Sequence, residues 1–350
     1  IKLIMAYTTI NKSTDYFNTK LYTGTGSSLV LTGVGHQPDM VWLKVRSTTS
    51  SHRITDVVRG TGQVIYPNDT AEQSAESSVT AFGTDGFTVG TEGGTNTNGA
   101  TYVGWSWKAG GGQGSSNTDG SINTTYTSVN TTSGFSISKY TGTGSNATIG
   151  HGLGVAPKVV MIKDLSVGKD WAVYHESIGN TKYLELNTTD AVGTASNAWN
   201  NTSPTSSVVS IGSRDTLNTS SNNYIAYCFA EKTGFSKFGQ YTGNGNADGT
   251  FVYTGFKPAF LLSKMSSGTQ GWFLVDNKRA NPYNPIDGSL HPNSNAAEDT
   301  ASDFFVDFTS NGFKLRDNDA QLNGSGSTYI YMAFAEAPLV GSNNVPATAR

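Results

Sequence analysis

The residues best placed to do chemistry are three glycine-rich pentads, because closely spaced glycines can present backbone N–H groups to a phosphate. YTGTG occupies residues 22–26 and 140–144, and YTGNG occupies 241–245. A phosphate loop also needs a helix directly after it and a third glycine or a Gly-Lys-Ser ending, whereas polar residues and a strand-like run follow each pentad. We therefore predict tight turns, with the first glycine of each pentad at positive φ. The predicted turn glycines are Gly24, Gly26, Gly142, Gly144, Gly243 and Gly245.

Acidic residues are the next candidates, because glycosidic cleavage uses two carboxylates held about 5–10 Å apart. Asp56, Glu176 and Asp276 occupy roughly matching places in the chain, one after each second strand. A single repeated carboxylate favours a structural role, capping a turn or pairing with Arg59 or Arg279. The histidines match no metal-binding spacing. We predict no catalytic residues, no metal site and no cofactor.

Two tryptophans suggest a binding surface. Trp171 and Trp272 each follow a repeated lysine by eight residues and have Asn, Asp and Ser nearby. Open β surfaces bind sugars with aromatic faces of this kind. The alternative interpretation is that both side chains fill the core of a sandwich, and the sequence leaves the two interpretations open.

The pentads begin a longer repeat. Each is followed by Gly-x-x-Pro, a short apolar run and a lysine six positions after the proline; the pairs are Pro38 and Lys44, Pro157 and Lys163, and Pro258 and Lys264. Aromatic strands close the copies, beginning at Tyr102, Tyr224 and Tyr329. The apolar runs are typical of buried strands and too short for helices. In the first closing strand we expect Val103, Trp105 and Trp107 to form the core of the copy and the small residues between them to face a neighbour.

A repeat of about a hundred residues is too long for a solenoid, so each copy should be a domain with its own core. We predict an all-β protein of three tandem β-sandwich domains, jelly-roll or immunoglobulin-like, with very little helix. The domains span 1–110, 134–232 and 233–350, the last with a C-terminal tail. Residues 111–133 are rich in Gly, Ser and Asn and are predicted to be a flexible linker that lets the first domain swing.

Composition excludes several partners. The formal charge is −3 with no cluster of Lys or Arg, which argues against nucleic acid. No apolar stretch reaches the roughly 18 residues that cross a bilayer, so we expect no membrane insertion. The single cysteine, Cys228, lies in an aromatic strand and should behave as a small apolar residue.

The motifs YTGTGSS, TGVGHQPDMVWLKVRS, HRITDVVRG, AFGTDGFTVG and TNGATYVGWSWKAGG are followed by FSISKYTGTGSNATIGHGLGVAPKVVMIKD and YIYMAFAEAPLVGSNNVPATAR. Together they resemble a family of virion structural proteins from phages of marine bacteria, cyanophages included, commonly described as tail-fibre-like. The resemblance covers nearly the whole chain. It implies a location on the virion surface, after assembly in the bacterial cytoplasm, and it supplies no catalytic residues.

The expected function is that of a non-enzymatic phage structural protein, as a tail appendage or a capsid decoration, with contact to host-surface glycans as an added role. Its expected partners are other virion proteins of the capsid or tail. It is also expected to form a homo-oligomer, with a trimer as the first expectation. The alternative is a glycan depolymerase of the tail.

Overall fold

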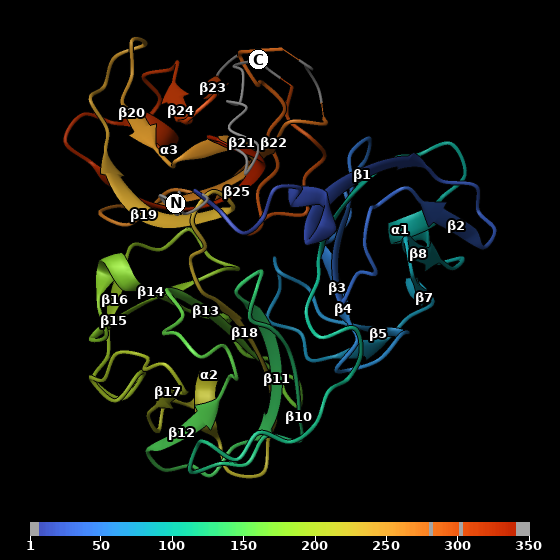
Figure 1. Ribbon diagram of the computed structural model, residues 1–350, viewed down its shortest axis with the longest axis vertical. Helices are drawn as coiled ribbons and strands as arrows, with labels where there is room; N and C mark the ends of the chain where they lie inside the picture. The colour runs from blue at the N-terminus through green and yellow to red at the C-terminus, as the bar shows by residue number, and fades with distance from the viewer. Residues whose placement is uncertain (1–6, 280–282, 301–303, 341–350) are drawn as a thin grey trace, which may run out of the picture.

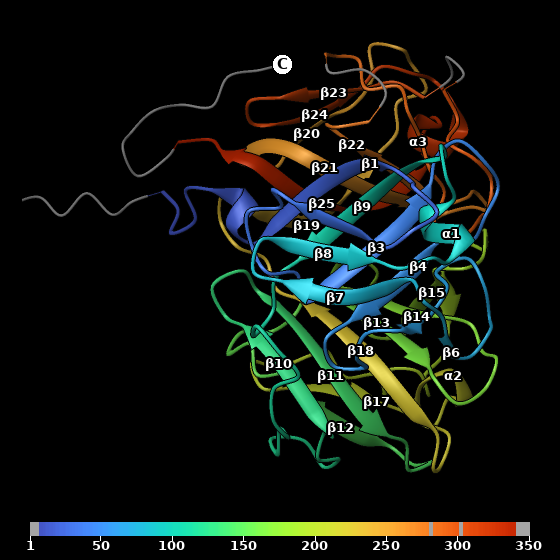
Figure 2. The same ribbon diagram turned by 90° about the vertical axis from the view of Figure 1, so that its right-hand side faces the viewer.

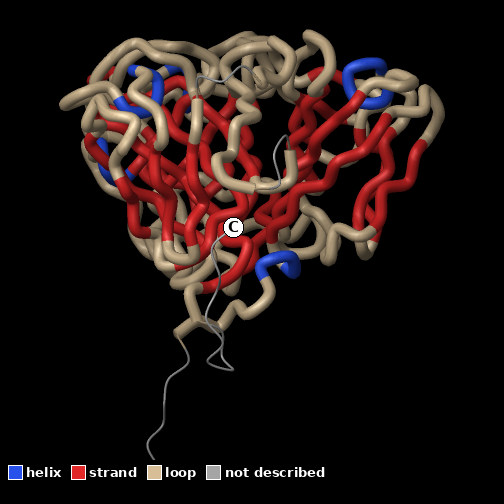
Figure 3. Tube along the Cα trace, turned by 90° about the horizontal axis from the view of Figure 1, so that it is seen from above, coloured by secondary structure: helices blue, strands red, loops and turns tan. Residues whose placement is uncertain are grey.

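Three similar β units surround a shared centre in the computed structural model, which describes residues 7–279, 283–300 and 304–340 (Figure 1). We call residues 7–110 unit 1, 111–232 unit 2 and 233–340 unit 3. Strands form the body of the molecule, and the helices are single short turns near its outside (Figure 3). The prediction of an all-β protein with very little helix is confirmed.

Each unit has an inner sheet in which the closing strand lies between the pentad strand and the post-proline strand. In unit 1 the order is β1 (Phe17–Thr23), β9 (Thr101–Trp107), β3 (Met40–Val45) and β4 (Arg53–Asp56). In unit 2 it is β10 (Tyr126–Asn130), β11 (Phe135–Thr141), β18 (Asn223–Phe229), β13 (Val159–Asp164), β14 (Ala172–His175), β15 (Lys182–Glu185) and β16 (Gly193–Thr194). In unit 3 it is β19 (Ser236–Thr242), β25 (Thr328–Pro338), β21 (Phe256–Met265) and β22 (Phe273–Asp276).

A smaller outer sheet packs on each inner sheet, as Figure 2 shows for β7 and β8 in front of β3. These sheets are β2 (Leu29–Thr32), β8 (Gly86–Val89) and β7 (Val79–Gly83); β12 (Ala147–Gly150) and β17 (Val208–Ile211); and β20 (Phe251–Tyr253), β24 (Gly312–Leu315) and β23 (Val306–Thr309). The remaining strands are β5 (Gln63–Val64) and β6 (Ser74–Ala75). The short helices are η1 (Ser13–Asp15), α1 (Gly93–Asn96), η2 (Glu176–Ile178), α2 (Asp215–Asn218) and α3 (Ala320–Asn323).

The side chains on the two faces of each inner sheet pack into different cores. In β3, Val41 and Leu43 pack against the outer sheet of their own unit. Met40 and Trp42, which alternate with them, point the other way into one cluster built by all three units. Each unit therefore has a small core of its own and shares a larger central one.

This arrangement reverses the expectation for the closing strands. The large residues of β9, Trp105 and Trp107, enter the central cluster together with Phe229 and Phe334 of the other units. The small face packs on the unit's own outer sheet, as Cys228 does in unit 2. The prediction that the large face makes the core of a single copy is wrong, because those residues join the copies together.

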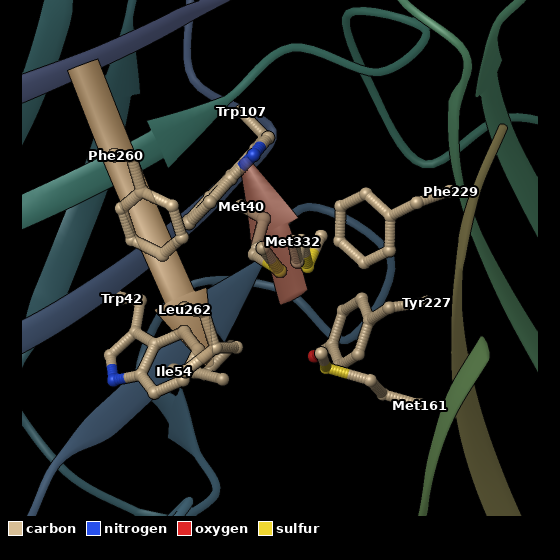
Figure 4. Close-up of a pocket in the computed structure, with 10 residues that line it drawn as sticks. All are labelled: Met40, Trp42, Ile54, Trp107, Met161, Tyr227, Phe229, Phe260, Leu262 and Met332. Carbon is tan, nitrogen blue, oxygen red and sulfur yellow. The ribbon is translucent and has the colours of Figure 1, made fainter. Parts of the chain in front are cut away.

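The centre of the molecule is closely packed. Met40, Trp107, Met161, Tyr227, Phe260 and Met332 are among the side chains that converge on one small apolar cavity (Figure 4). Its volume is about 10 Å³, close to the least space that a water molecule needs. Unit 1 contributes as much to this cluster as the other units, so the prediction that it swings more than the other two is wrong.

The predicted flexible linker, 111–133, is ordered for most of its length. Its last part forms β10, which pairs antiparallel with β11 from Tyr126 opposite Lys139 to Asn130 opposite Phe135. An earlier part contacts the outer sheet through Ile122, which bridges in parallel to Ile149. Hydroxyl and amide side chains, read from composition as a sign of flexibility, form the hydrogen bonds that hold this segment in place.

Candidate functional site

The two tryptophans predicted as a sugar-binding surface are buried. Trp171 is 0% exposed and Trp272 is 2% exposed. Each donates its indole N–H across a boundary between units, Trp171 to the carbonyl of Tyr66 and Trp272 to the carbonyl of Glu185, both over 2.9 Å. The glycan-binding prediction for these residues is wrong, because neither ring has a face open to a sugar.

His52 takes the corresponding place in unit 1. Its Nδ1 accepts the indole N–H of Trp42 over 2.9 Å, so the remaining ring proton sits on Nε2 and is donated to the carbonyl of His291 over 3.1 Å. Burial lowers the pKa of His52 well below its ordinary value. One ring N–H thus links each unit to another. His52 joins unit 1 to unit 3, Trp171 joins unit 2 to unit 1, and Trp272 joins unit 3 to unit 2, so the three links close a circle.

The carboxylate candidates lie in a second circle of contacts. Asp56 receives the guanidinium of Arg59 over 2.6 Å, and Asp276 receives that of Arg279 over 2.6 Å, as the sequence predicts. All four side chains are at most 1% exposed. Such buried pairs are already neutralised and hydrogen-bonded, so neither carboxylate is available as a general acid or base.

Each of these carboxylates also binds a neighbouring unit. The phenol of Tyr227 donates to Asp56 over 2.6 Å, and the indole of Trp105 donates to Asp276 over 2.9 Å. In unit 2 the register places His175, and not Glu176, at the corresponding position opposite Val159. His175 Nε2 lies 3.2 Å from the carbonyl of Tyr331. This contact joins unit 2 to unit 3 and closes the second circle with an imidazole in place of a carboxylate.

The repeated lysines Lys44, Lys163 and Lys264 are fully buried. Each ammonium donates to the carbonyl of the next residue over 2.8–3.0 Å. Lys163 also reaches the carbonyl of Thr70 in unit 1 over 3.0 Å, and Lys264 reaches that of Thr189 in unit 2 over 3.2 Å. Burial lowers the pKa of each lysine to about 8. Lys163 and Lys264 therefore join units as well.

The pentad glycines form turns, but the second glycine of each pentad, and not the first, has the positive φ. Gly26, Gly144 and Gly245, second in each pentad, have φ of 72°, 75° and 65°. The first glycines lie where a Cβ would come within 2.2–2.4 Å of a carbonyl oxygen, as for Gly142 against Thr219 and Gly243 against Gly324. The prediction that the first glycines supply positive φ is wrong; close backbone approach requires them.

An asparagine at the end of each short helix holds the pentad turn, and sequence reasoning missed it. The side chain of Asn218 accepts the N–H of Thr143 over 2.7 Å and donates to the carbonyls of Ser145 and Gly212. Asn96 and Asn323 make the matching contacts in units 1 and 3. The signal was present, because Asn96, Asn218 and Asn323 each stand six positions before the tyrosine that opens the closing strand. No ligand is needed to satisfy these turns.

A polar cavity of about 40 Å³ lies between units 1 and 3. Thr19 and Asn277 line it, and the oxygens Thr19 Oγ1 and Asn277 Oδ1 have no hydrogen-bond partner among the described residues. Its size and lining suit water molecules and are too small for a sugar ring. Among the described residues no three His, Cys, Asp or Glu side chains gather as a metal site, and none of the described helices has the length and apolar character to span a bilayer.

Two aromatic side chains that face outward lie together on β20 of unit 3, whereas Tyr7 and Tyr283, which are 37% and 70% exposed, lie outside the strands. Phe251 is 46% exposed and Tyr253 is 53% exposed. They alternate with buried Val252 on the edge strand of the outer sheet. The adjacent Lys314 is paired with Asp248 over 2.6 Å. The candidate functional site is therefore this edge of unit 3, whose strand β20 carries no charged residue of its own.

Comparison with known proteins adds one result. No curated protein matches the chain. A family model matches residues 12–338, a span that takes in all three units from η1 to the end of β25. The chain therefore belongs to the family described as domain of unknown function DUF7483.

Proposed function

We propose that the protein is a non-enzymatic structural protein of a bacteriophage particle, exposed on the particle surface as a tail appendage or a capsid decoration. The observation that carries the proposal is that the residues expected to do chemistry are used to join the three units. Asp56, Asp276, Trp171 and Trp272 are buried in contacts between units. A protein that uses these charged and aromatic groups in this way gains a rigid body and leaves none of the four free for catalysis.

The resemblance to virion structural proteins supplies the location. An all-β body without disulfides, closed by circles of buried hydrogen bonds, suits the exterior of a particle. Contact with host glycans is not part of the proposal, because the two tryptophans that suggested it are covered. The depolymerase alternative has less support, since Asp56 and Asp276 are held in buried ion pairs and Glu176 pairs with Lys158 at the surface.

Labelling with a specific antibody on intact particles, read by electron microscopy, tests the location. We expect label on the outside of the particle, and its copy number and symmetry assign it to the capsid or the tail. Particles that carry no label, while unassembled protein in infected cells does, contradict the proposal.

Incubation of the pure protein with envelope polysaccharide, followed by an assay for new reducing ends, tests the absence of catalysis. We expect no release above a boiled control. Release at enzyme-like rates contradicts the non-enzymatic role. Light scattering of the pure protein tests whether it forms a trimer or another homo-oligomer.

A further inference from the structure

One side of the unit 2 sandwich is closed by residues 115–130, the segment that leads in from unit 1 (Figure 1). The second half of this segment is β10, which extends the inner sheet beyond β11. The first half extends the outer sheet beyond β12. There Ile122 donates its N–H to the carbonyl of Thr148 over 3.0 Å, and the N–H of Thr148 donates to Ser121 Oγ over 2.9 Å. Both sheet edges on this side are thereby covered.

The corresponding sides of units 1 and 3 are open in the described parts of the chain. β1 and β2 end the two sheets of unit 1, and β19 and β20 end those of unit 3. Burial reflects the difference. Tyr140 and Ile149 in the closed unit are 0% exposed, whereas Tyr241 and Val252, their counterparts in unit 3, are each 7% exposed. Within the described residues, no segment covers this side of unit 3 as residues 115–130 cover unit 2.

The backbone of β20 offers a hydrogen-bonding edge. Thr250 accepts from Leu315, and Thr254 donates to Asn311, so the even-numbered residues of this stretch bond inward to the β24 side. In an antiparallel pair the residues between them point their N–H and C=O groups to the other side. Phe251 and Tyr253 therefore present their backbone groups outward, as Thr148 does in unit 2, where Ser121 and Ile122 bind them.

Unit 3 is better suited than unit 1 to take up a strand. A charged residue near a sheet edge discourages pairing, and unit 1 has Lys20 two positions before its pentad tyrosine. Ser138 and Gly239 stand at that position in units 2 and 3. β20 itself carries no charge and no proline. Tyr7 lies at the far end of this strand, where its hydroxyl donates to the carbonyl of Gly255 over 2.7 Å and interacts with the side chain of Tyr253.

We propose that β20 of unit 3 is a docking edge for an extended segment of another polypeptide chain, added in parallel as Ser121 and Ile122 are added to β12 in unit 2. The partner segment has an apolar β-branched residue in the place of Ile122, which would cover Val252 and Tyr241. Phe251 replaces Thr148, whose hydroxyl accepts the N–H of Ser121 over 2.8 Å in unit 2. The partner therefore has an apolar residue at the place of Ser121, to lie beside the exposed ring of Phe251. This inference goes beyond the proposed function and does not depend on where in a particle the protein sits.

The probe is an acetylated peptide with the sequence of residues 115–130 in which Ser121→Val adapts it to Phe251. A second peptide carries Ile122→Asp as well and is its matched control. Hydrogen exchange of the full chain is measured by NMR with each peptide at about 1 mM. We expect the first peptide to slow exchange of the Phe251 and Tyr253 amides by about tenfold or more. We expect the second to leave exchange at both amides unchanged.

Two protein variants separate backbone pairing from contact with the ring. Phe251→Pro removes the outward N–H, and proline is tolerated on an edge strand whose N–H faces solvent. Phe251→Val keeps the N–H and removes the aromatic ring. We expect Phe251→Pro to weaken peptide binding by about tenfold or more, and Phe251→Val to weaken it less. Thermal unfolding of both variants checks that the fold is kept.

Unchanged exchange at Phe251 and Tyr253 with the first peptide overturns the proposal, and this measurement needs no variant. Equal binding of both peptides, or equal binding by the two protein variants, also overturns it. If these amides become protected with rising protein concentration alone, the edge pairs with a second copy of this chain. Protection by soluble oligosaccharide and not by peptide assigns the surface to a glycan. Either result overturns the proposal of a separate polypeptide partner.

Discussion

Tyr227 of unit 2 donates its phenolic proton to the carboxylate of Asp56 in unit 1 over 2.6 Å, and that carboxylate also binds the buried guanidinium of Arg59. Neither the aspartate nor the arginine is exposed. One carboxylate thus neutralises a buried charge and joins two units. Burial and the neighbouring carboxylate raise the pKa of Tyr227 well above its ordinary value, so the phenol keeps the proton that it donates.

Asp56→Asn should be among the most destabilising conservative substitutions in the chain. It leaves the Arg59 guanidinium buried without a counter-charge, which in other proteins lowers the free energy of unfolding by about 3–5 kcal/mol. Chemical denaturation measures the loss. The control is Asp248→Asn, which removes an ion pair whose carboxylate side chain is 80% exposed and should lower the free energy of unfolding far less, because water screens an exposed pair. Equal losses in the two variants would refute the structural role of Asp56.

The repeat was the part of the fold that the sequence could predict, because the Gly-x-x-Pro spacing and the closing aromatic strands return in register. The sequence could not predict which core each face of a strand joins. Trp105 is large and apolar, and a core within one unit or between units would accept it equally. Trp171 posed the same problem, since an indole has an apolar body and one N–H, and both a sugar site and a buried boundary use those properties. The difference depends on contacts with Tyr66, distant in sequence.

Stability should fall as the pH drops from about 6.5 to 4. Burial lowers the pKa of His36 and of His175 to about 4, so in this interval the unfolded chain binds protons that the folded chain does not. Stability then rises with pH, and the contribution is present above pH 6.5 and lost as the pH falls toward 4. Each histidine should contribute about 3 kcal/mol. Urea denaturation between pH 4 and 7 measures the slope.

His175→Asn provides the internal control for this pH dependence. The amide oxygen can accept the N–H of Ser177 in place of His175 Nδ1, which does so in the folded protein over 3.2 Å. Because asparagine does not titrate, the pH slope of this variant should be shallower than that of the native chain by the share of one histidine. An unchanged slope would mean that folding does not lower the pKa of His175.

The pentad glycines should respond to alanine in the order that their geometry sets. Gly142→Ala places a Cβ 2.2 Å from the carbonyl oxygen of Thr219, so the backbone must move. Gly144→Ala meets a neighbour at 3.4 Å and is disfavoured mainly by its φ of 75°, a penalty of about 1–2 kcal/mol. We therefore expect Gly142→Ala to lower the melting temperature more. Gly112→Ala, which has open space, should leave it unchanged, and the opposite order would support the simple turn interpretation.

Asn218→Ala should loosen the pentad turn of unit 2 and leave the central core intact. The buried amide of Asn218 is bonded to Thr143, Ser145 and Gly212, and unmet buried groups lower the free energy of unfolding by about 1–3 kcal/mol each. Because the affected groups belong to residues 143–145 and the loop before α2, amide exchange there should accelerate while amides of β18 stay protected. Asn146→Ala, which removes an exposed contact with Asn200, is the control and should change neither. Uniform acceleration across units 1 and 3 would instead mean that the asparagine stabilises the whole body, and that the turns are not locally held.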